Sequence, residues 1–174
     1  MRSNAGALER SRNVMKPTNI TRLLDSRKIE YTAFELPPEK LGALETARLL
    51  DVPIDSVYKS IVLTRKGRGK TILAVVPGNL EVNLKAVAQL LGEKKVVKAT
   101  ERDAERLTGL QAGGISPLAL INRGFQVVID SSAHAQDKIH ISGGKRGLNI
   151  QLSPLALATL TKASFADICT TFPE

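Results

Sequence analysis

The sequence predicts a mixed α+β fold, and three observations carry that prediction. Helix-like and strand-like segments follow one another irregularly instead of in regular βαβ units. Two β-branched runs, at residues 60–64 and 71–76, flank a short polar segment as the strands of a hairpin do. The 174 residues, 43% of them hydrophobic, suit one domain with a core of its own. Together these features favour a mixed, largely antiparallel sheet over a parallel one.

The segment 1–17 precedes the predicted domain, which we place at residues 18–174. It carries four basic residues against one acid, Glu9, and has no apolar stretch of the kind that a secretory signal needs. We expect a disordered basic arm. Contact with RNA and an organelle transit peptide are the two alternatives. The basic residues are Arg2, Arg10, Arg12 and Lys16.

The first elements of the domain follow from capping residues and apolar spacing. The polar pair at 18–19 can cap a helix that runs to about Arg27. Alternation of apolar and polar residues over 29–33 predicts a short strand. A second helix is expected at 43–50, and it stops before Pro53.

The turn of the predicted hairpin, residues 65–70, contains four cations and two glycines. A solvated loop tip is the simpler interpretation of this composition. A contact to phosphate is the alternative.

The second half of the domain continues the irregular pattern. Asn83 and Gly92 mark the two ends of a helix, and Thr100 and Gly109 mark those of the next. Ser153, with proline after it, opens a last helix that reaches about residue 162. The expected strands are 96–97, 127–129, 139–141 and 148–152.

The amino-acid composition excludes several kinds of site and partner for this protein. A formal charge of +8 and a pI near 9.8 suit a polyanionic partner. Cys169 is the single cysteine, which excludes an internal disulfide and any multi-cysteine metal site and fits a reducing compartment. An aromatic content of 3% argues against a base-stacking platform. No apolar run approaches the ~18 residues of a membrane helix, so we expect a cytoplasmic protein without membrane contact.

The common catalytic groups are missing from the sequence. His134 and His140 have neither HExxH spacing nor an obvious metal-binding partner, so we interpret them as surface or structural residues. Cys169 has no local context that would activate a thiolate, and no Gly-x-Ser-x-Gly motif is present. We therefore expect neither a metal nor a cofactor.

Three segments remain as candidates for a site. Lys59 lies at the start of an apolar strand, where it could snorkel to water or donate to a phosphate or ribose oxygen. The segment 111–117 contains paired glycines and a proline, as either a structural turn or a substrate loop would. The segment 142–147 could be a basic hairpin tip or a nest of amides for an anion, although its spacing is not that of a Walker loop.

These segments resemble a known family. VYKS at 57–60, GGISP at 113–117 and SGGKRGL at 142–148 are similar to the signature segments of the YbaK/EbsC group, and they occur in the same order. That group contains free-standing relatives of the editing insertion domain of bacterial prolyl-tRNA synthetase. The resemblance spans about residues 18–168. It implies a mixed α+β sheet curled into a partial barrel with surrounding helices.

The resemblance also implies an activity and site residues. The family removes wrong amino acids from tRNA, typically cysteine from Cys-tRNA(Pro), which makes tRNA the expected partner and prolyl-tRNA synthetase a further one. By position, Lys59 engages the terminal adenosine or its phosphate, and a Gly-x-x-x-Pro loop lies against the aminoacyl ester. Lys59 and Gly113 are thus the expected catalytic residues. The expected substrate-binding residues are Gly114, Ile115, Ser116, Pro117, Ser142, Gly143, Gly144, Lys145, Arg146 and Asn149.

One position departs from the family pattern. Asn149 replaces the aspartate of close YbaK relatives, so it keeps an acceptor but loses the charge that would bind an α-ammonium group. In that family the substrate thiol is thought to attack its own carbonyl, which would explain the missing nucleophile. Hydrolysis of another ester, such as Ala-tRNA(Pro), by an ordered water is the second hypothesis. A non-catalytic module that binds tRNA or a synthetase is the third.

Overall fold

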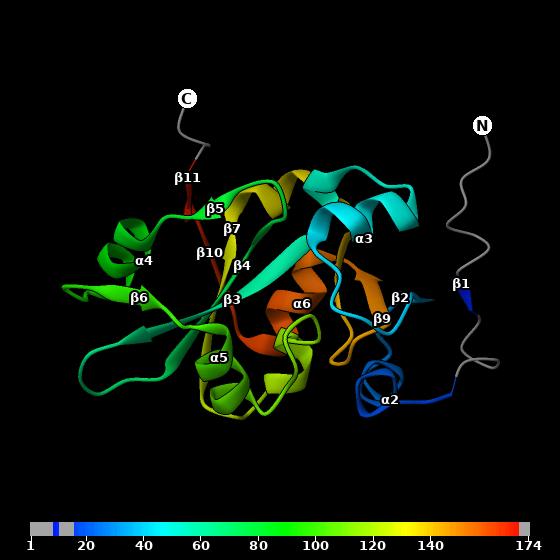
Figure 1. Cartoon of the computed structure of the whole chain (residues 1–174), viewed down its shortest axis with the longest axis horizontal. Coiled ribbons are helices and arrows are strands. Elements are labelled where there is room, and N and C mark those ends of the chain that lie inside the picture. Colours follow the sequence, from blue (N-terminus) through cyan, green and yellow to red (C-terminus); the bar gives the residue numbers. More distant parts are fainter. Residues whose placement is uncertain (1–8, 11–15, 171–174) are drawn as a thin grey trace.

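A five-stranded mixed sheet forms the centre of the molecule (Figure 1). The computed structural model describes residues 9–10 and 16–170. In the central sheet β10 and β7 run parallel to β4, whereas β3 and β6 are antiparallel to their neighbours. The strands, in sheet order, are β10 (Ser164–Ala166), β7 (Phe125–Asp130), β4 (Thr71–Pro77), β3 (Tyr58–Arg65) and β6 (Val96–Lys98).

A second sheet of four strands packs beside the first, and all of its pairings are antiparallel. A parallel bridge between Val57 and His140 joins the two sheets. The strands of the second sheet are β1 (Glu9–Arg10), β2 (Tyr31–Glu35), β9 (Leu148–Leu152) and β8 (Ile139–Ser142). A two-stranded ribbon consists of β5 (Glu81–Val82) and β11 (Cys169–Thr170).

The predicted fold class is confirmed. Most strand pairs are antiparallel; among the described strands, the parallel pairs are those of β7 with β4 and with β10, and the single bridge from Val57 to His140 is parallel as well. The two larger sheets curve around a shared core without closing into a barrel, because a single bridge connects them.

The helices begin and end largely where the sequence predicts. The Thr18 hydroxyl accepts from the Thr21 amide and caps α2, and the Asn83 side-chain oxygen Oδ1 accepts from the Ala86 amide and caps α4. Gly92 and Gly109 end α4 and α5 in the left-handed conformation that glycine adopts at least cost. The helices are α2 (Asn19–Ser26), α3 (Ala43–Leu50), α4 (Leu84–Leu91), α5 (Glu101–Thr108) and α6 (Pro154–Thr161). Short 3-10 turns form at Ile54–Ser56, Pro117–Leu120 and Ser131–Ala135.

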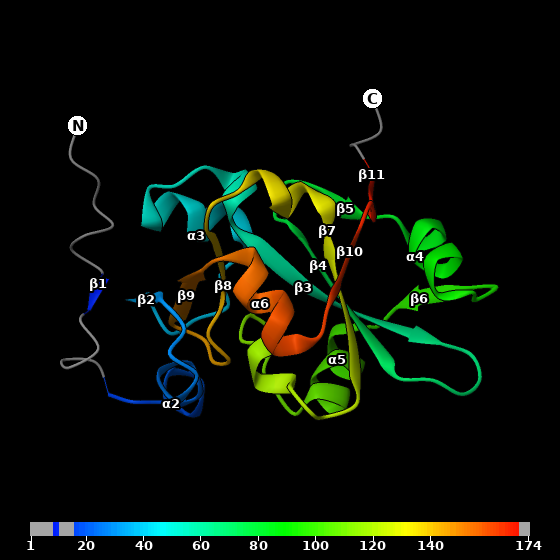
Figure 2. The same ribbon diagram turned by 180° about the vertical axis from the view of Figure 1, so that it is seen from behind.

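The core lies on both faces of β4. Leu73 and Val75 pack into one apolar cluster with residues of the second sheet, while Ile72, Ala74 and Val76 pack into another with α4. This two-sided burial explains why the strand is a nearly continuous apolar run instead of an alternating one. Figures 1 and 2 show α4 on one side of the central sheet and α6 with the second sheet on the other.

The structure differs from the sequence prediction at the first strand. We expected it at 29–33, but β2 begins at Tyr31. Lys28 adopts a left-handed φ of 57°, and the Ile29 amide donates to the Leu24 carbonyl, so the end of α2 holds these residues in a turn.

Most of the predicted basic arm lies outside the described residues. Glu9 and Arg10 pair antiparallel with Phe34 and Ala33 of β2. Disorder of the remaining arm and the boundary at residue 18 stay predictions.

Candidate functional site

A pocket of about 520 Å³ opens at the edge of β3, where segments distant in the sequence meet. Its walls come from the loop at 36–43, from β3, from the segment that joins β6 to α5, and from two glycine loops. The first glycine loop, residues 111–116, follows α5, and the second, residues 143–147, joins β8 to β9. The pocket is of a size typical for small-molecule sites.

The edge of β3 supplies main-chain groups to this pocket. β6 covers the edge only at residues 63–65, and the bridge to His140 covers it at Val57. The Val62 carbonyl accepts from the Ala99 amide on this side. Because strand amides alternate between the two edges, the N–H and C=O groups of Ser60 face the same way, into the pocket.

Lys59 lines the pocket, as the sequence predicted. Its Nζ lies 3.4 Å from the Gly78 carbonyl oxygen and 3.6 Å from Glu81 Oε1. The lysine side chain is 27% exposed and that of Glu81 is 54% exposed. An ion pair this open to water is worth about 0–1 kcal/mol, so a substrate anion can replace Glu81 at little cost.

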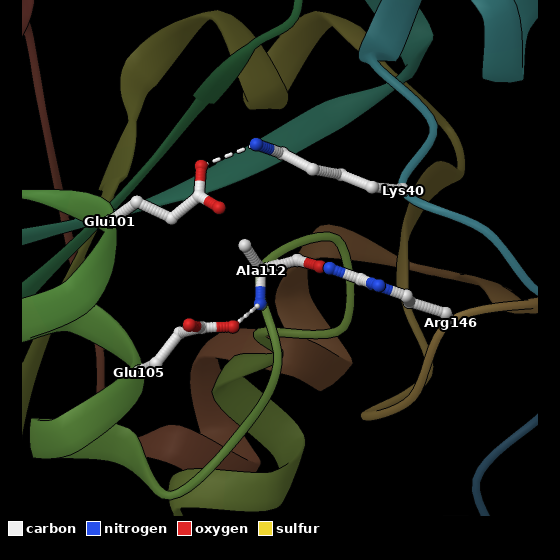
Figure 3. A network of polar contacts seen from close by, with 5 residues as sticks. All are labelled: Lys40, Glu101, Glu105, Ala112 and Arg146. Atoms are coloured by element: carbon white, nitrogen blue, oxygen red, sulfur yellow. Dashed lines mark hydrogen bonds and ion pairs between the residues drawn. The ribbon is translucent and has the colours of Figure 1, made fainter.

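Two charged side chains hold the first glycine loop at Ala112 (Figure 3). The Ala112 amide donates to Glu105 Oε2 over 2.8 Å, and Arg146 Nε donates to the Ala112 carbonyl over 2.7 Å. Gly113 follows with a φ of +88° and faces the pocket. Charge-assisted hydrogen bonds to the amide and to the carbonyl of Ala112 fix the loop between α5 and the second glycine loop.

The glycines of the two loops permit their close packing. A Cβ at Gly114 would lie 2.9 Å from the Lys145 Cα, and one at Gly143 would lie 2.4 Å from the Leu148 Cγ. Ser142 bridges the loops, because its hydroxyl donates to the Gly113 carbonyl over 3.5 Å and accepts from the Gly144 amide over 3.3 Å. Gly114 is thus required for contact between the loops, and Gly143 for the close turn from β8 to β9.

The loop amides are only partly available to a ligand. The Gly114 amide donates to the Gln111 carbonyl, and the Gly143 amide donates to the Leu148 carbonyl. The Gly144 amide donates to the Ser142 hydroxyl, so the first two glycines of the second loop are not free to donate to an anion. Among the described residues, no acceptor lies within hydrogen-bonding distance of the Gly113 or Ile115 amide, and both residues line the pocket.

Asn149 reaches the pocket from β9, and His140 stands behind it. His140 Nδ1 lies 2.9 Å from Asn149 Oδ1, and its Nε2 lies 3.4 Å from Gln151 Nε2. Burial, which disfavours the imidazolium, lowers the pKa of His140 against a smaller opposing effect of the bond to Asn149. A neutral ring that accepts from Gln151 at Nε2 carries its proton on Nδ1 and donates to Asn149. Asn149 Oδ1 is thereby engaged, which leaves Nδ2 as the group of this pocket-lining amide that can donate to a ligand.

The structure brings together five of the residues predicted for the site. These are Lys59, Gly113, Ile115, Ser142 and Asn149, which all line the pocket. Among the others, Ser116 and Pro117 are buried, with Ser116 Oγ accepting from the Leu118 amide. Gly114, Gly143 and Gly144 pack within or between the loops. Lys145 and Arg146 border a smaller depression on the outer side. A substrate role for each remains a prediction.

Sequence reasoning missed an ion pair at this pocket. Lys40 and Glu101 line it from opposite sides and form a salt bridge, with both side chains about half exposed (Figure 3). Lys98, from the end of β6, lines it as well. Lys40 follows a diproline loop and Glu101 opens a helix, so only the tertiary fold reveals their pairing. We found no sequence signal that singles out either residue.

Cys169 lies close enough to Lys59 and Glu81 to feel their charges, but its thiol is not activated. Burial, reinforced by Asp130, raises the pKa of Cys169 to about 12, which is the opposite of an activated thiol. Within the described residues, no three His, Cys, Asp or Glu side chains are placed to hold a metal. No helix in that part of the chain is long and apolar enough to cross a membrane.

Comparison with protein families identifies the family of the chain. Residues 37–160 match the family described as the aminoacyl-tRNA editing domain. That range contains all three glycine- and lysine-bearing segments of the pocket. The chain belongs to the aminoacyl-tRNA editing domain family. The resemblance to the YbaK/EbsC group inferred from the three motifs is thereby confirmed.

Individual relatives agree with this assignment. The chain is 32% identical over 161 residues to EbsC of Enterococcus faecalis, provisionally named a Cys-tRNA(Pro)/Cys-tRNA(Cys) deacylase, and the match covers 91% of this chain and 97% of EbsC. It is 30% identical over 129 residues to the proline–tRNA ligase of Trichlorobacter lovleyi, covering 68% of this chain and 22% of the ligase. A solved structure described as a candidate trans-editing enzyme for prolyl tRNA synthetase has the same fold, with a TM-score of 0.74 and 23% identity over 90% of this chain and all of that one.

Proposed function

We propose that this editing-domain protein hydrolyses misacylated tRNA in trans, with Cys-tRNA(Pro) as its main substrate. Family membership gives aminoacyl-tRNA editing as the class of reaction. The name of EbsC supports the cysteinyl ester as the substrate. A proline–tRNA ligase contains a segment related to this chain, so prolyl-tRNA synthetase is the proposed partner. The cytoplasm is the proposed location.

The observation that carries this proposal is the convergence of Lys59, Gly113, Ile115, Ser142 and Asn149 on one pocket. Its volume of about 520 Å³ suits an aminoacylated nucleoside and excludes the tRNA body. Lys59 supplies a cation for a phosphate or ribose oxygen at one end. The amides of Gly113 and Ile115 supply donors for a carbonyl oxygen that becomes negatively charged during ester cleavage.

Few protein groups are needed because an aminoacyl ester is already reactive. In the proposed step the cysteine sulfur of the substrate attacks its own carbonyl carbon, and a carbon–sulfur bond forms. The ester carbon–oxygen bond then breaks, and the ribose oxygen leaves with the proton that the thiol lost. The pocket contributes orientation and oxyanion stabilisation. A thiolactone leaves and reacts with water outside the site.

Asn149 favours a second candidate, the hydrolysis of Ala-tRNA(Pro) or a similar small ester by an ordered water. Its amide donor faces the pocket where a carboxylate would bind the α-ammonium group. Ammonium binding is then weaker, and a donor is available to hold the oxygen of a water molecule. Amino-acid preference could therefore differ from that of close relatives that carry aspartate.

Purified protein tested on a panel of aminoacyl-tRNAs separates these possibilities. We expect release of cysteine from Cys-tRNA(Pro) above the buffer rate, with at least a tenfold loss in the Lys59→Ala variant. Release of alanine at a similar or higher rate would select the water mechanism. Equal release by wild type, variant and buffer on every ester would overturn the proposal and leave a binding module.

A further inference from the structure

A group of unpaired cations lies at one end of the molecule, and we call it the basic ridge. It consists of Lys66, Arg68 and Lys70 in the β3–β4 hairpin turn, and of Lys94 and Lys95 just before β6. The two segments are neighbours because β6 pairs with the end of β3, with Arg65 opposite Val96. Figures 1 and 2 both show the hairpin beside β6, with α2 at the far end.

The charge of this ridge is not compensated within the described part of the chain. All five side chains are exposed, and no ion pair there includes any of them. The acid beside them, Glu93, is bound to Arg65 at 3.0 Å, and that arginine is only 9% exposed. Like charges gathered without counter-charges raise the local positive potential, which a polyanion lowers on binding.

The ridge continues into the mouth of the pocket. Lys98, at the other end of β6, is exposed and lines the pocket, about 10 Å along the strand from Lys95. A chain of phosphates that ends in the pocket therefore meets one cation at the mouth and then a succession of cations beyond it. Of the two interpretations of the hairpin turn, phosphate contact is the one that this arrangement of cations supports.

We propose that the basic ridge binds the phosphate backbone of the tRNA acceptor stem while the aminoacylated end occupies the pocket. This inference rests on the proposed function, because it takes the pocket as the place of the ester. Phosphate contacts position a nucleic acid without reading its sequence. The ridge thus supplies affinity for tRNA in general, and selectivity comes from the pocket.

Two charge-removal variants test the ridge: Lys66→Ser/Arg68→Ser/Lys70→Ser, and Lys94→Ser/Lys95→Ser. The matched control is Arg22→Ser/Arg27→Ser, which removes two exposed cations from the distant end of the molecule. Deacylation of full-length aminoacyl-tRNA is compared with that of an aminoacylated CCA trinucleotide between 50 and 200 mM salt. Affinity for uncharged tRNA is measured by fluorescence anisotropy.

We expect the ridge variants to raise KM for full-length tRNA with little change in kcat, and to leave the trinucleotide reaction within about twofold. Each lost phosphate contact lowers the slope of log KM against log salt by about 0.9. Between 50 and 200 mM salt, the increase in KM then becomes smaller by roughly 3.5-fold per lost contact. Over this salt range, KM of the triple variant should therefore rise by a factor that is roughly 10- to 40-fold smaller than that of the wild type.

Unchanged tRNA affinity and salt slope in both variants would overturn the inference. So would weaker binding of prolyl-tRNA synthetase with tRNA binding intact, since that would make the ridge a protein-docking surface. A different result would contradict the proposed function: wild-type protein that cleaves neither the full-length aminoacyl-tRNA nor the trinucleotide. In that case the anisotropy measurement still decides whether the ridge binds tRNA.

Discussion

Arg146→Met tests how the first glycine loop is held in place. Arg146 Nε donates to the Ala112 carbonyl over 2.7 Å, and methionine keeps the unbranched stem without the donor. A hydrogen bond from a charged group is worth about 1.5–3 kcal/mol. Glu105 still holds the Ala112 amide, so the loop stays attached on one side. At about 1.4 kcal/mol per factor of ten, the equilibrium constant between the ordered and the released loop falls roughly 10- to 100-fold.

The assay measures kcat and KM on full-length aminoacyl-tRNA and on the aminoacylated trinucleotide. We expect Arg146→Met to lower kcat by up to that factor on both substrates, because the Gly113 amide belongs to the same peptide unit as the released Ala112 carbonyl. Lys145→Met removes the neighbouring cation, which is exposed, and should change only KM for full-length tRNA if it contacts phosphate. Arg22→Met, on α2, should leave both parameters unchanged.

The opposite pattern would refute this reasoning. If Arg146→Met raised KM only for full-length tRNA, with the same loss of salt dependence as Lys145→Met, both side chains would be phosphate contacts. Arg146 would then not position the loop. Measurement of thermal stability beside the kinetics excludes a general folding defect as the cause of a lower kcat.

Three further predictions follow from the site. The pKa of His140 lies below its ordinary 6.5, so below that pH the unfolded chain binds more protons than the folded one. As the pH falls, the free energy of unfolding should therefore drop by at most about 1.4 kcal/mol per pH unit. This contribution should vanish in His140→Gln and persist in His134→Gln, the control at an exposed histidine. Asn149→Asp places a carboxylate 2.9 Å from the imidazole nitrogen and should raise the pKa of His140 in an NMR titration; an unchanged pKa would contradict the contact. Gly143→Ala forces a Cβ into a buried leucine and should cost about 1–3 kcal/mol, or roughly 2–10 °C in Tm, whereas Gly42→Ala, with open space around it, should change Tm much less.

The elements that sequence reasoning located well are those with strong local signals. Asn83 and Gly92 mark the ends of α4 in the sequence and in the structure, because a side-chain cap and a left-handed glycine act within a few residues. The β3–β4 hairpin was equally predictable from two β-branched runs. The short strands β5, β10 and β11 were missed, since two or three residues carry no periodic signal and pair only with distant partners.

The site was predictable in part. Lys59, Gly113 and Asn149 were found because the segments around them resemble a family, and the structure brings all three to one pocket. Arg146 was expected to contact substrate, yet in this structure it donates to Ala112, a contact between loops that are 34 positions apart. His140 was interpreted as a surface or structural residue; it is buried, and its contact with Asn149 depends on the β8–β9 register. Such pairings arise from tertiary packing.

Chemical-shift mapping tests the central claim most directly. A stable amide analogue of cysteinyl-adenosine is titrated into isotope-labelled protein, and the amide signals are followed by NMR. The account predicts that the largest changes fall at Lys59, Ser60, Gly113, Ser142 and Asn149, around the pocket at the edge of β3. Changes gathered instead at the outer depression beside Lys145, or none at millimolar analogue, would contradict it.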